Sequence, residues 1–402
     1  MEIPGIADIV RKIDVESHAE MQVQTMKSVI PALLGLALFL SVLSCQRAED
    51  SLKLGFVGPL SGHWADLGVA GRNGALLAIE KINSSGGIKG RMLELVVRDD
   101  RNDPVTVKAV DNELIRSGVA AIIGHMTSSA AETALPIVNK ARIVMLSPTV
   151  SSTDFNGIDD YFLRINPANQ GVARKLSELI ATGTPIRRVA AICDLSNRSN
   201  TESYLTGFRT DFENRGGKVV NVTTFNHPGE PHFFELASKL LQQKPEGILI
   251  LASALDTALL AQQIRKQDKM VPLFTTGWSA SEDLISNGGS AVEGIRFFQT
   301  FNQNDTGTAY TAFKESYRKR FGVTPSFAAL NAYECILVIS EAVAVNDDLA
   351  KLKETILAKG SFRGVQAEFA IDRYGDTVRK PFLMTIKDGR FIQITPDRNP
   401  GS

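Results

Sequence analysis

The residues with the clearest chemistry are three consecutive hydroxyls, Thr127, Ser128 and Ser129, which follow a short apolar segment. A helix is expected to begin near Ala130, which places these hydroxyls at its N-terminus. Free backbone N–H groups and the helix dipole make such a terminus suitable for binding an anion, for example a carboxylate. Ser128 and the nearby His125 also have the residue types of a hydrolase pair, but no Gly-x-Ser-x-Gly sequence surrounds the serine. The pattern therefore favours binding over catalysis.

Histidines and tryptophans offer the other candidate side chains. His125 is expected to have a structural role, and the remaining histidines show no ligand spacing, so the sequence predicts no metal site. The only tryptophans, Trp64 and Trp278, each follow a predicted strand. Clefts in α/β proteins bind ligands at such strand ends. We expect the two indoles to form an aromatic wall against an apolar or ring-bearing ligand, with packing of their own loops as the alternative.

These residues must be positioned by an alternation of strands and helices that runs along most of the chain. The first series has strands at 54–57, 93–97, 120–123 and 143–146 and helices at 69–83, 104–117 and 130–140. The second has helices at 171–182, 202–215, 233–243 and 256–266 and strands at 189–193, 218–222, 247–251 and 273–275. Such alternation predicts an α/β fold with two lobes, each a parallel sheet flanked by helices.

The C-terminal part continues with helices at 327–345 and 349–359 and with late strands at 367–371, 382–386 and 391–394. Before them, four aromatic residues recur at helical spacing, which predicts a buried helix face: Tyr310, Phe313, Tyr317 and Phe321. Helices beyond the second series can return to the first lobe and leave a cleft between the lobes.

Several segments in order carry a family resemblance: GPLSG at 58–62, INSSGGIKGR at 82–91, IIGHMTSS at 122–129, LSPTVS at 146–151 and FLRINP at 162–167. Over residues 52–396 the chain resembles the branched-chain (Leu/Ile/Val) amino-acid binding proteins, which are type I periplasmic binding proteins of ABC importers. The resemblance implies two Rossmann-like lobes joined by a three-crossing hinge that close over a ligand. Lobe 1 would comprise 51–168 plus 299–372, and lobe 2 would comprise 169–298 plus 373–398.

The resemblance also implies a ligand site. Ser128 matches the hydroxyl that binds the ligand carboxylate, Ser151 matches a second hydroxyl, and the backbone carbonyl of Thr149 or Val150 would accept from the ligand ammonium. Helix capping or turn formation is the alternative role for each serine.

The chain departs from the family pattern where the ammonium would bind. Ser199-Asn200-Thr201 replaces a Tyr-Gly pair in lobe 2, and Asn200 becomes a candidate ligand contact. The usual acid is absent from the loop that holds Trp278. Asp256 is our choice as its substitute, with helix N-capping as its alternative role; other candidates are Asp194, Glu202 and Glu282. Loss of the acid puts an ordinary α-amino acid in doubt and admits a carboxylate without the amine, including an aromatic one.

A targeting segment precedes the lobes. Residues 29–44 carry no charge and follow Lys27, as in a signal peptide. VLSC at 42–45 resembles a bacterial lipobox, in which Cys45 is lipidated; an ordinary signal peptide is the alternative. Residues 1–25 then precede the true start codon or form a cytoplasmic tail. Cys193 and Cys335 are expected as buried thiols, with a disulfide between them left open.

The amino-acid composition excludes one class of function. The 402 residues contain 44 Lys+Arg and 44 Asp+Glu, which excludes the basic excess typical of nucleic-acid binders. The resemblance and the targeting segment together imply a monomeric, lipid-anchored, extracytoplasmic solute-binding protein without enzymatic activity, which delivers an amino acid or related carboxylate to an ABC permease. The alternatives are a sensor that feeds a receptor or regulator, and a hydrolase that uses Ser128 and His125.

Overall fold

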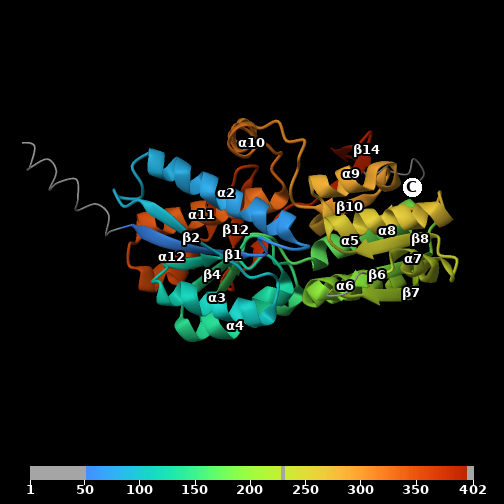
Figure 1. Cartoon of the computed structure of the whole chain (residues 1–402), viewed down its shortest axis with the longest axis horizontal. Coiled ribbons are helices and arrows are strands. Elements are labelled where there is room, and N and C mark those ends of the chain that lie inside the picture. The colour runs from blue at the N-terminus through green and yellow to red at the C-terminus, as the bar shows by residue number, and fades with distance from the viewer. Residues whose placement is uncertain (1–50, 228–230, 396–402) are drawn as a thin grey trace, which may run out of the picture. The chain divides into compact units, whose positions relative to one another are not determined.

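The computed structural model describes residues 51–227 and 231–395, and Cys45 with the whole targeting segment lies outside them. Two main sheets organise the described residues (Figure 1). The first has the order β2-β1-β3-β4-β5, with every pair parallel. Its strands are β1 (Leu52–Gly58), β2 (Leu93–Asp99), β3 (Ala121–Ile123), β4 (Val144–Ser147) and β5 (Phe162–Arg164).

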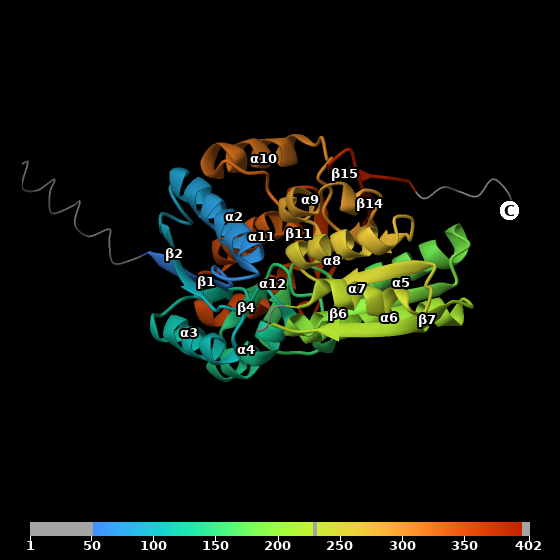
Figure 2. The same ribbon diagram turned by 45° about the vertical axis from the view of Figure 1, so that its right-hand side comes forward.

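Helices cover both faces of this sheet, as the two views show (Figures 1 and 2). One face carries α2 (Ala65–Ser84), α10 (Thr308–Phe321), α11 (Phe327–Val345) and α12 (Leu352–Lys359), and the other carries α3 (Pro104–Arg116) and α4 (Ser128–Ala141). Side chains alternate along β1: Leu54 and Phe56 pack on the face covered by α2 and α11, and Val57 packs on the face covered by α3 and α4. This period of two is what a sheet buried on both faces requires.

The second sheet has the order β15-β14-β10-β9-β8-β6-β7. It is parallel except where β14 pairs with its two neighbours. Its strands are β6 (Arg188–Asp194), β7 (Lys218–Phe225), β8 (Gly247–Leu251), β9 (Leu273–Phe274), β10 (Arg296–Gln299), β14 (Phe382–Lys387) and β15 (Arg390–Gln393). Its helices are α5 (Gln170–Gly183), α6 (Arg198–Asn214), α7 (Phe233–Leu241), α8 (Ala254–Gln267) and α9 (Glu282–Gly288).

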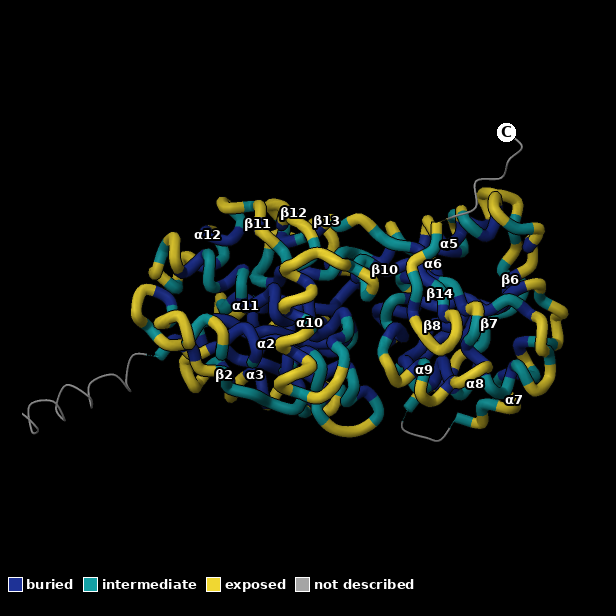
Figure 3. Tube along the Cα trace, turned by 90° about the horizontal axis from the view of Figure 1, so that it is seen from above, coloured by how far each residue is buried: buried dark blue, intermediate teal, exposed yellow. Residues whose placement is uncertain are grey.

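We call the first sheet with its helices lobe 1 and the second lobe 2. The buried residues gather inside each lobe, whereas exposed residues occupy the outer turns and loops (Figure 3). The predicted α/β architecture with two lobes is confirmed. The chain passes between lobes after β5, after β10 and after β13 (Thr377–Val378). Because β13 pairs with β12 (Glu368–Ile371) in a small sheet with β11 (Ser361–Arg363), the last crossing lies beyond Asp372, the residue at which we expected it.

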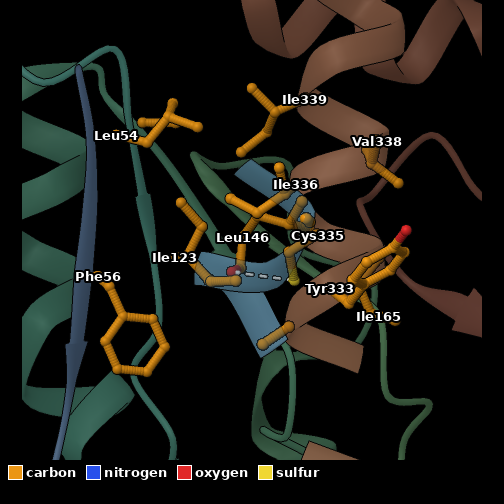
Figure 4. Close-up of a cluster of buried hydrophobic side chains, with 14 of the residues drawn as sticks. Leu54, Phe56, Ile123, Leu146, Ile165, Tyr333, Cys335, Ile336, Val338 and Ile339 are labelled. Carbon is orange, nitrogen blue, oxygen red and sulfur yellow. Dashed lines mark hydrogen bonds between the residues drawn. The ribbon is translucent and has the colours of Figure 1, made fainter. Parts of the chain in front are cut away.

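The core of lobe 1 explains three features of the sequence. Figure 4 shows part of it, where the Cys335 thiol donates to the Leu146 carbonyl oxygen at 3.7 Å. Cys335 and Cys193 are both buried free thiols in different lobes, so no disulfide joins them. The predicted aromatic stripe packs in this core through Tyr310, Phe313 and Tyr317, as expected. Helix α11 is long and apolar enough to span a membrane, but 72% of its most apolar stretch is buried inside the protein.

Candidate functional site

A pocket lies between the two lobes, at the carboxyl ends of strands from both sheets. Lobe 1 contributes Met126, Ser128, Thr149, Ser151 and Phe327; lobe 2 contributes Asn197, Asn200, Tyr204, Thr276, Gly277 and Trp278; and the first two crossings and their flanks contribute Asn166, Pro167, Asn169, Val172, Phe298, Gln299, Thr300 and Phe301. We call this the cleft pocket. None of the described residues that line it is charged.

The N-terminus of α4 forms one wall of the cleft pocket. The helix begins at Ser128, two residues earlier than expected, and Thr127 caps it by accepting a hydrogen bond from the Ala130 N–H at 3.3 Å. The Ser128 hydroxyl oxygen accepts from the backbone N–H groups of Ser151 and Ser152, at 3.4 and 3.3 Å. Both contacts use lone pairs, so the Ser128 proton remains free to donate to a ligand.

The Ser151 hydroxyl has a similar arrangement on the same wall. Its oxygen accepts from the Asn200 side chain of lobe 2 at 2.7 Å, which again leaves the proton available. The Thr149 carbonyl oxygen, which was expected to meet a ligand ammonium, instead accepts from the Asn166 side chain at 3.2 Å. The pocket therefore offers two hydroxyl donors on this wall.

Two further polar groups of the cleft pocket lack partners. Both side-chain amide atoms of Gln299 and the hydroxyl of Tyr204 are buried without a hydrogen bond to any described residue. Burial raises the pKa of Tyr204, so its phenol stays protonated and acts as a donor. Leaving a buried polar group unsatisfied costs about 1–3 kcal/mol, so these groups favour a ligand that bonds to them.

Glycine shapes the pocket beside Gln299. A Cβ atom at Gly277 would lie 2.9 Å from the Cβ of Gln299. The loop after β9 can therefore pass the end of β10, which carries Gln299, only with glycine at position 277. The next residue, Trp278, packs against the core of lobe 1 although it belongs to lobe 2. Together with Phe298, Phe301 and Phe327 it gives the pocket an aromatic wall.

The structure brings five of the predicted ligand contacts into the cleft pocket: Ser128, Thr149, Ser151, Asn200 and Trp278. Thr127 and Val150 lie just behind them, as helix cap and buried core residue. Ser129 connects the lobes, because its N–H donates to Asn197 Oδ1 and its hydroxyl accepts from the Ser199 N–H, both at 3.3 Å. Gln299 and Tyr204 were not predicted as contacts, although Tyr204 is four residues after Asn200 and so shares its helix face.

Trp64 and Asp256 do not line the cleft pocket. Asp256 is fully buried in the first turn of α8, and its Oδ1 lies 2.9 Å from His63 Nε2 while its Oδ2 lies 3.4 Å from His227 Nε2. Trp64 packs edge-on against both histidine rings. The structure thus brings two of these histidines together with Asp256, a contact that the sequence did not predict. The loops that carry them come from different lobes, and spacing along the chain does not reveal that contact.

None of the other candidate acids reaches the cleft pocket either. Asp194 is buried at the end of β6, Glu202 pairs with Arg198 at 2.9 Å on the surface of α6, and Glu282 is exposed at the start of α9. No described carboxylate is thus available to pair with a ligand ammonium in the pocket.

His125 is buried and engaged at both ring nitrogens. Nδ1 lies 2.7 Å from Asp100 Oδ2, and Nε2 lies 3.1 Å from Asp111 Oδ1. Burial alone lowers the pKa of His125, but the carboxylates of Asp111 and Asp100 outweigh it and raise the pKa to about 10. A protonated histidine held by two carboxylates cannot accept a proton from Ser128, so this geometry offers no hydrolase pair.

The lobes contact each other around the cleft pocket. Asn102 of lobe 1 donates to the Ser196 carbonyl oxygen at 3.2 Å, the hydroxyls of Thr153 and Ser203 lie 2.8 Å apart, and Ser281 donates to Asp66 Oδ2 at 3.1 Å. These bonds show that residues of the two lobes are in direct contact.

Comparison with known proteins agrees with this architecture. The family model described as periplasmic binding protein matches residues 51–390. A leucine-, isoleucine-, valine-, threonine- and alanine-binding protein of Pseudomonas aeruginosa is 28% identical over 342 residues, which cover 83% of this chain and 89% of that protein. A homologue of Leu/Ile/Val-binding proteins from Brucella melitensis is 22% identical over 317 residues, covering 77% of this chain and 84% of that protein.

Solved structures give the same fold. The substrate-binding protein LivJ of Streptococcus pneumoniae, in complex with isoleucine, has a TM-score of 0.78 at 22% identity and covers 86% of this chain and 100% of its own. A solute-binding protein of R. palustris in complex with benzoate has a TM-score of 0.78 at 21% identity, covering 86% of this chain and 95% of its own. The chain therefore belongs to the periplasmic binding protein family.

Proposed function

We propose that this protein is an extracytoplasmic solute-binding protein that captures a small carboxylate without an α-amino group and delivers it to an ABC importer. The proposal rests on one observation: none of the described residues that line the cleft pocket is charged. Hydroxyl donors at a helix N-terminus and aromatic side chains line it, and no described carboxylate does. The ligand body would be aromatic or otherwise apolar.

The pocket chemistry suits a carboxylate better than an amino acid. A carboxylate gains hydrogen bonds from Ser128 and Ser151 together with the favourable field of the α4 N-terminus. An ammonium group would lose its hydration without meeting an opposite charge, and the Thr149 carbonyl already accepts from Asn166. Structures of the same fold hold either isoleucine or benzoate, so the fold itself accommodates both ligand classes.

The two lobes would act as a hinged clamp. Lobe 1, which includes the chain up to β5 and from the end of β10 through β13, would move against lobe 2 about the crossings that follow β5, β10 and β13. Closure excludes water from the cleft pocket and strengthens its hydrogen bonds. We further propose that the monomeric clamp is anchored by lipid at Cys45 and works with a permease.

The test is a set of ligands that differ by one group. Calorimetric titrations of the purified chain would compare leucine with 4-methylpentanoate, phenylalanine with 3-phenylpropanoate, and benzoate with benzamide. We expect a desamino acid to bind more tightly than its amino acid and benzoate to bind more tightly than the uncharged amide. Tighter binding of both amino acids than of their desamino partners would overturn the ligand assignment, and binding of none of the carboxylates would overturn the function.

A further inference from the structure

The strongest unassigned feature is the group formed by His63, His227 and Asp256, which we call the histidine cluster. His63 belongs to the β1–α2 loop of lobe 1, whereas His227 follows β7 and Asp256 lies in the first turn of α8, both in lobe 2. Their ligand atoms all lie within 4.8 Å of one another. We propose that the histidine cluster binds a divalent transition-metal ion of the zinc class and that this ion bridges the two lobes.

The distances fit a tetrahedral ion. Zinc binds histidine nitrogen and carboxylate oxygen at about 2.0–2.2 Å, which places neighbouring ligand atoms about 3.3 Å apart. The separations are 2.9 Å from His63 Nε2 to Asp256 Oδ1 and 3.4 Å from His227 Nε2 to Asp256 Oδ2, and the ligand atoms all lie within 4.8 Å of one another. Each histidine faces a different oxygen of the one carboxylate. Three protein ligands are the number found in zinc sites that keep an exchangeable fourth ligand.

The hydrogen-bonding pattern favours a metal over a simple ion pair. His63 Nε2 and Asp256 Oδ1 are close, yet both are buried and neither has a hydrogen-bond partner. Two ligand atoms that both point at one metal ion lie close together without being aligned for a hydrogen bond to each other. The other oxygen, Asp256 Oδ2, accepts from the Ser253 hydroxyl at 2.8 Å and lies within hydrogen-bond distance of His227 Nε2 at 3.4 Å, and these contacts fix the orientation of the carboxylate.

The surroundings favour a cation. Asp194 is fully buried, interacts electrostatically with Asp256 and both histidines, and has one oxygen, Oδ2, without a hydrogen-bond partner. A cation would stabilise both of these buried carboxylates. Nitrogen ligands select zinc-class ions over magnesium or calcium, which prefer all-oxygen sites.

Aromatic packing holds the histidine rings in place while leaving a route for the ion. The two rings lie 4.2 Å apart, and Trp64 packs edge-on against both, with centroids at 5.6 Å from His63 and 5.5 Å from His227. The side chains of His63 and His227 remain 23% and 16% exposed, so an ion can reach them from solvent. The site is thus preorganised but accessible.

The experiment is a calorimetric titration of the metal-stripped mature chain, purified without a histidine tag, with zinc chloride. We expect one zinc ion per chain, at least tenfold weaker binding in His63→Gln and in His227→Gln, and unchanged binding in His232→Gln, the matched control at an exposed position. Magnesium chloride should give no binding. The effect of His63→Gln tests the bridging itself, because its partners lie in the other lobe.

Cobalt substitution provides a second measurement on the unaltered chain. Cobalt(II) held by these ligands should give the intense visible absorption of four-coordinate cobalt, and one equivalent of zinc should abolish it. The proposal is overturned if zinc does not bind at one ion per chain, if His63→Gln binds zinc as the wild type does, or if cobalt shows only the pale spectrum of the hydrated ion. The identity of the carboxylate does not enter these outcomes, so they are independent of the proposed transport function.

Discussion

The hydroxyl of Tyr204 provides the sharpest test of the cleft pocket, because its removal should affect stability and affinity in opposite directions. The hydroxyl is buried in the cleft pocket and has no hydrogen-bond partner among the described residues. In the ligand-free chain, Tyr204→Phe removes an unsatisfied polar group whose burial costs about 1–3 kcal/mol. The free energy of unfolding should therefore rise by about 1 kcal/mol, since a partly hydrated hydroxyl recovers only part of that cost.

The same substitution should weaken the complex. A hydrogen bond from a phenol to a charged carboxylate contributes about 1.5–3 kcal/mol, which corresponds to a loss of about 10- to 100-fold in affinity. Calorimetric titration with the tightest desamino carboxylate measures the affinity, and the urea midpoint of the ligand-free chain measures the stability.

Tyr310→Phe is the matched control. Its hydroxyl is also buried without a partner, but it lies in the core of lobe 1 and does not line the cleft pocket. This variant should gain similar stability and keep its affinity. If the two variants keep the same affinity for the carboxylate, Tyr204 does not contact the ligand, and the reasoning from unpartnered groups fails.

Three other outcomes are expected. Ser128→Ala should weaken carboxylate binding by about 1–3 kcal/mol in the same titration, because a charged acceptor loses a donor; unchanged affinity would contradict its place in the site. For His125, whose pKa is raised to about 10, the folded state holds the proton more tightly than the unfolded chain. This stabilisation is complete below about pH 6.5 and is lost as the pH rises through about 10, so the urea midpoint should fall over that range and the slope should flatten in His125→Gln. Burial raises the pKa of Cys193 to about 12 and that of Cys335 well above the usual value, so neither thiol should react with a thiol reagent at pH 8 until the chain is unfolded; rapid labelling of the native chain would contradict their burial.

Local pattern was sufficient to predict most of the fold. Strand β8 and helix α11 have the expected bounds, because a continuous apolar run and a long helical period are each signals contained in one segment. Strand β5 was not predicted as a strand, since its short apolar run ends at the charged residue Arg164, whereas the equally short β3 is wholly apolar. The last crossing was placed too early because β13 is only two residues long and is defined by its pairing with β12.

The residues of the candidate site were likewise predicted only in part. The hydroxyls at the start of α4 follow from a strand, a short turn and a helix, which are adjacent in the sequence. Gln299 and Tyr204 become candidates only when the crossings and α6 come together around the cleft pocket, since their distinguishing property is burial without a partner. Asp256, our choice to pair with a ligand ammonium, lies outside the cleft pocket, and its neighbours come from loops of two lobes that no spacing rule connects.

The cleft pocket and the histidine cluster share one physical consequence. Each takes residues from both lobes, Ser128 with Asn200 in the first and His63 with His227 in the second. A carboxylate and a zinc ion would therefore both stabilise the arrangement in which the lobes are in contact. Thermodynamic linkage then requires that zinc raise the affinity for the carboxylate by the same factor by which the carboxylate raises the affinity for zinc. Each titration repeated at saturation with the other ligand measures one coupling free energy twice, and a factor of one in both would mean that the two sites do not respond to the same closure.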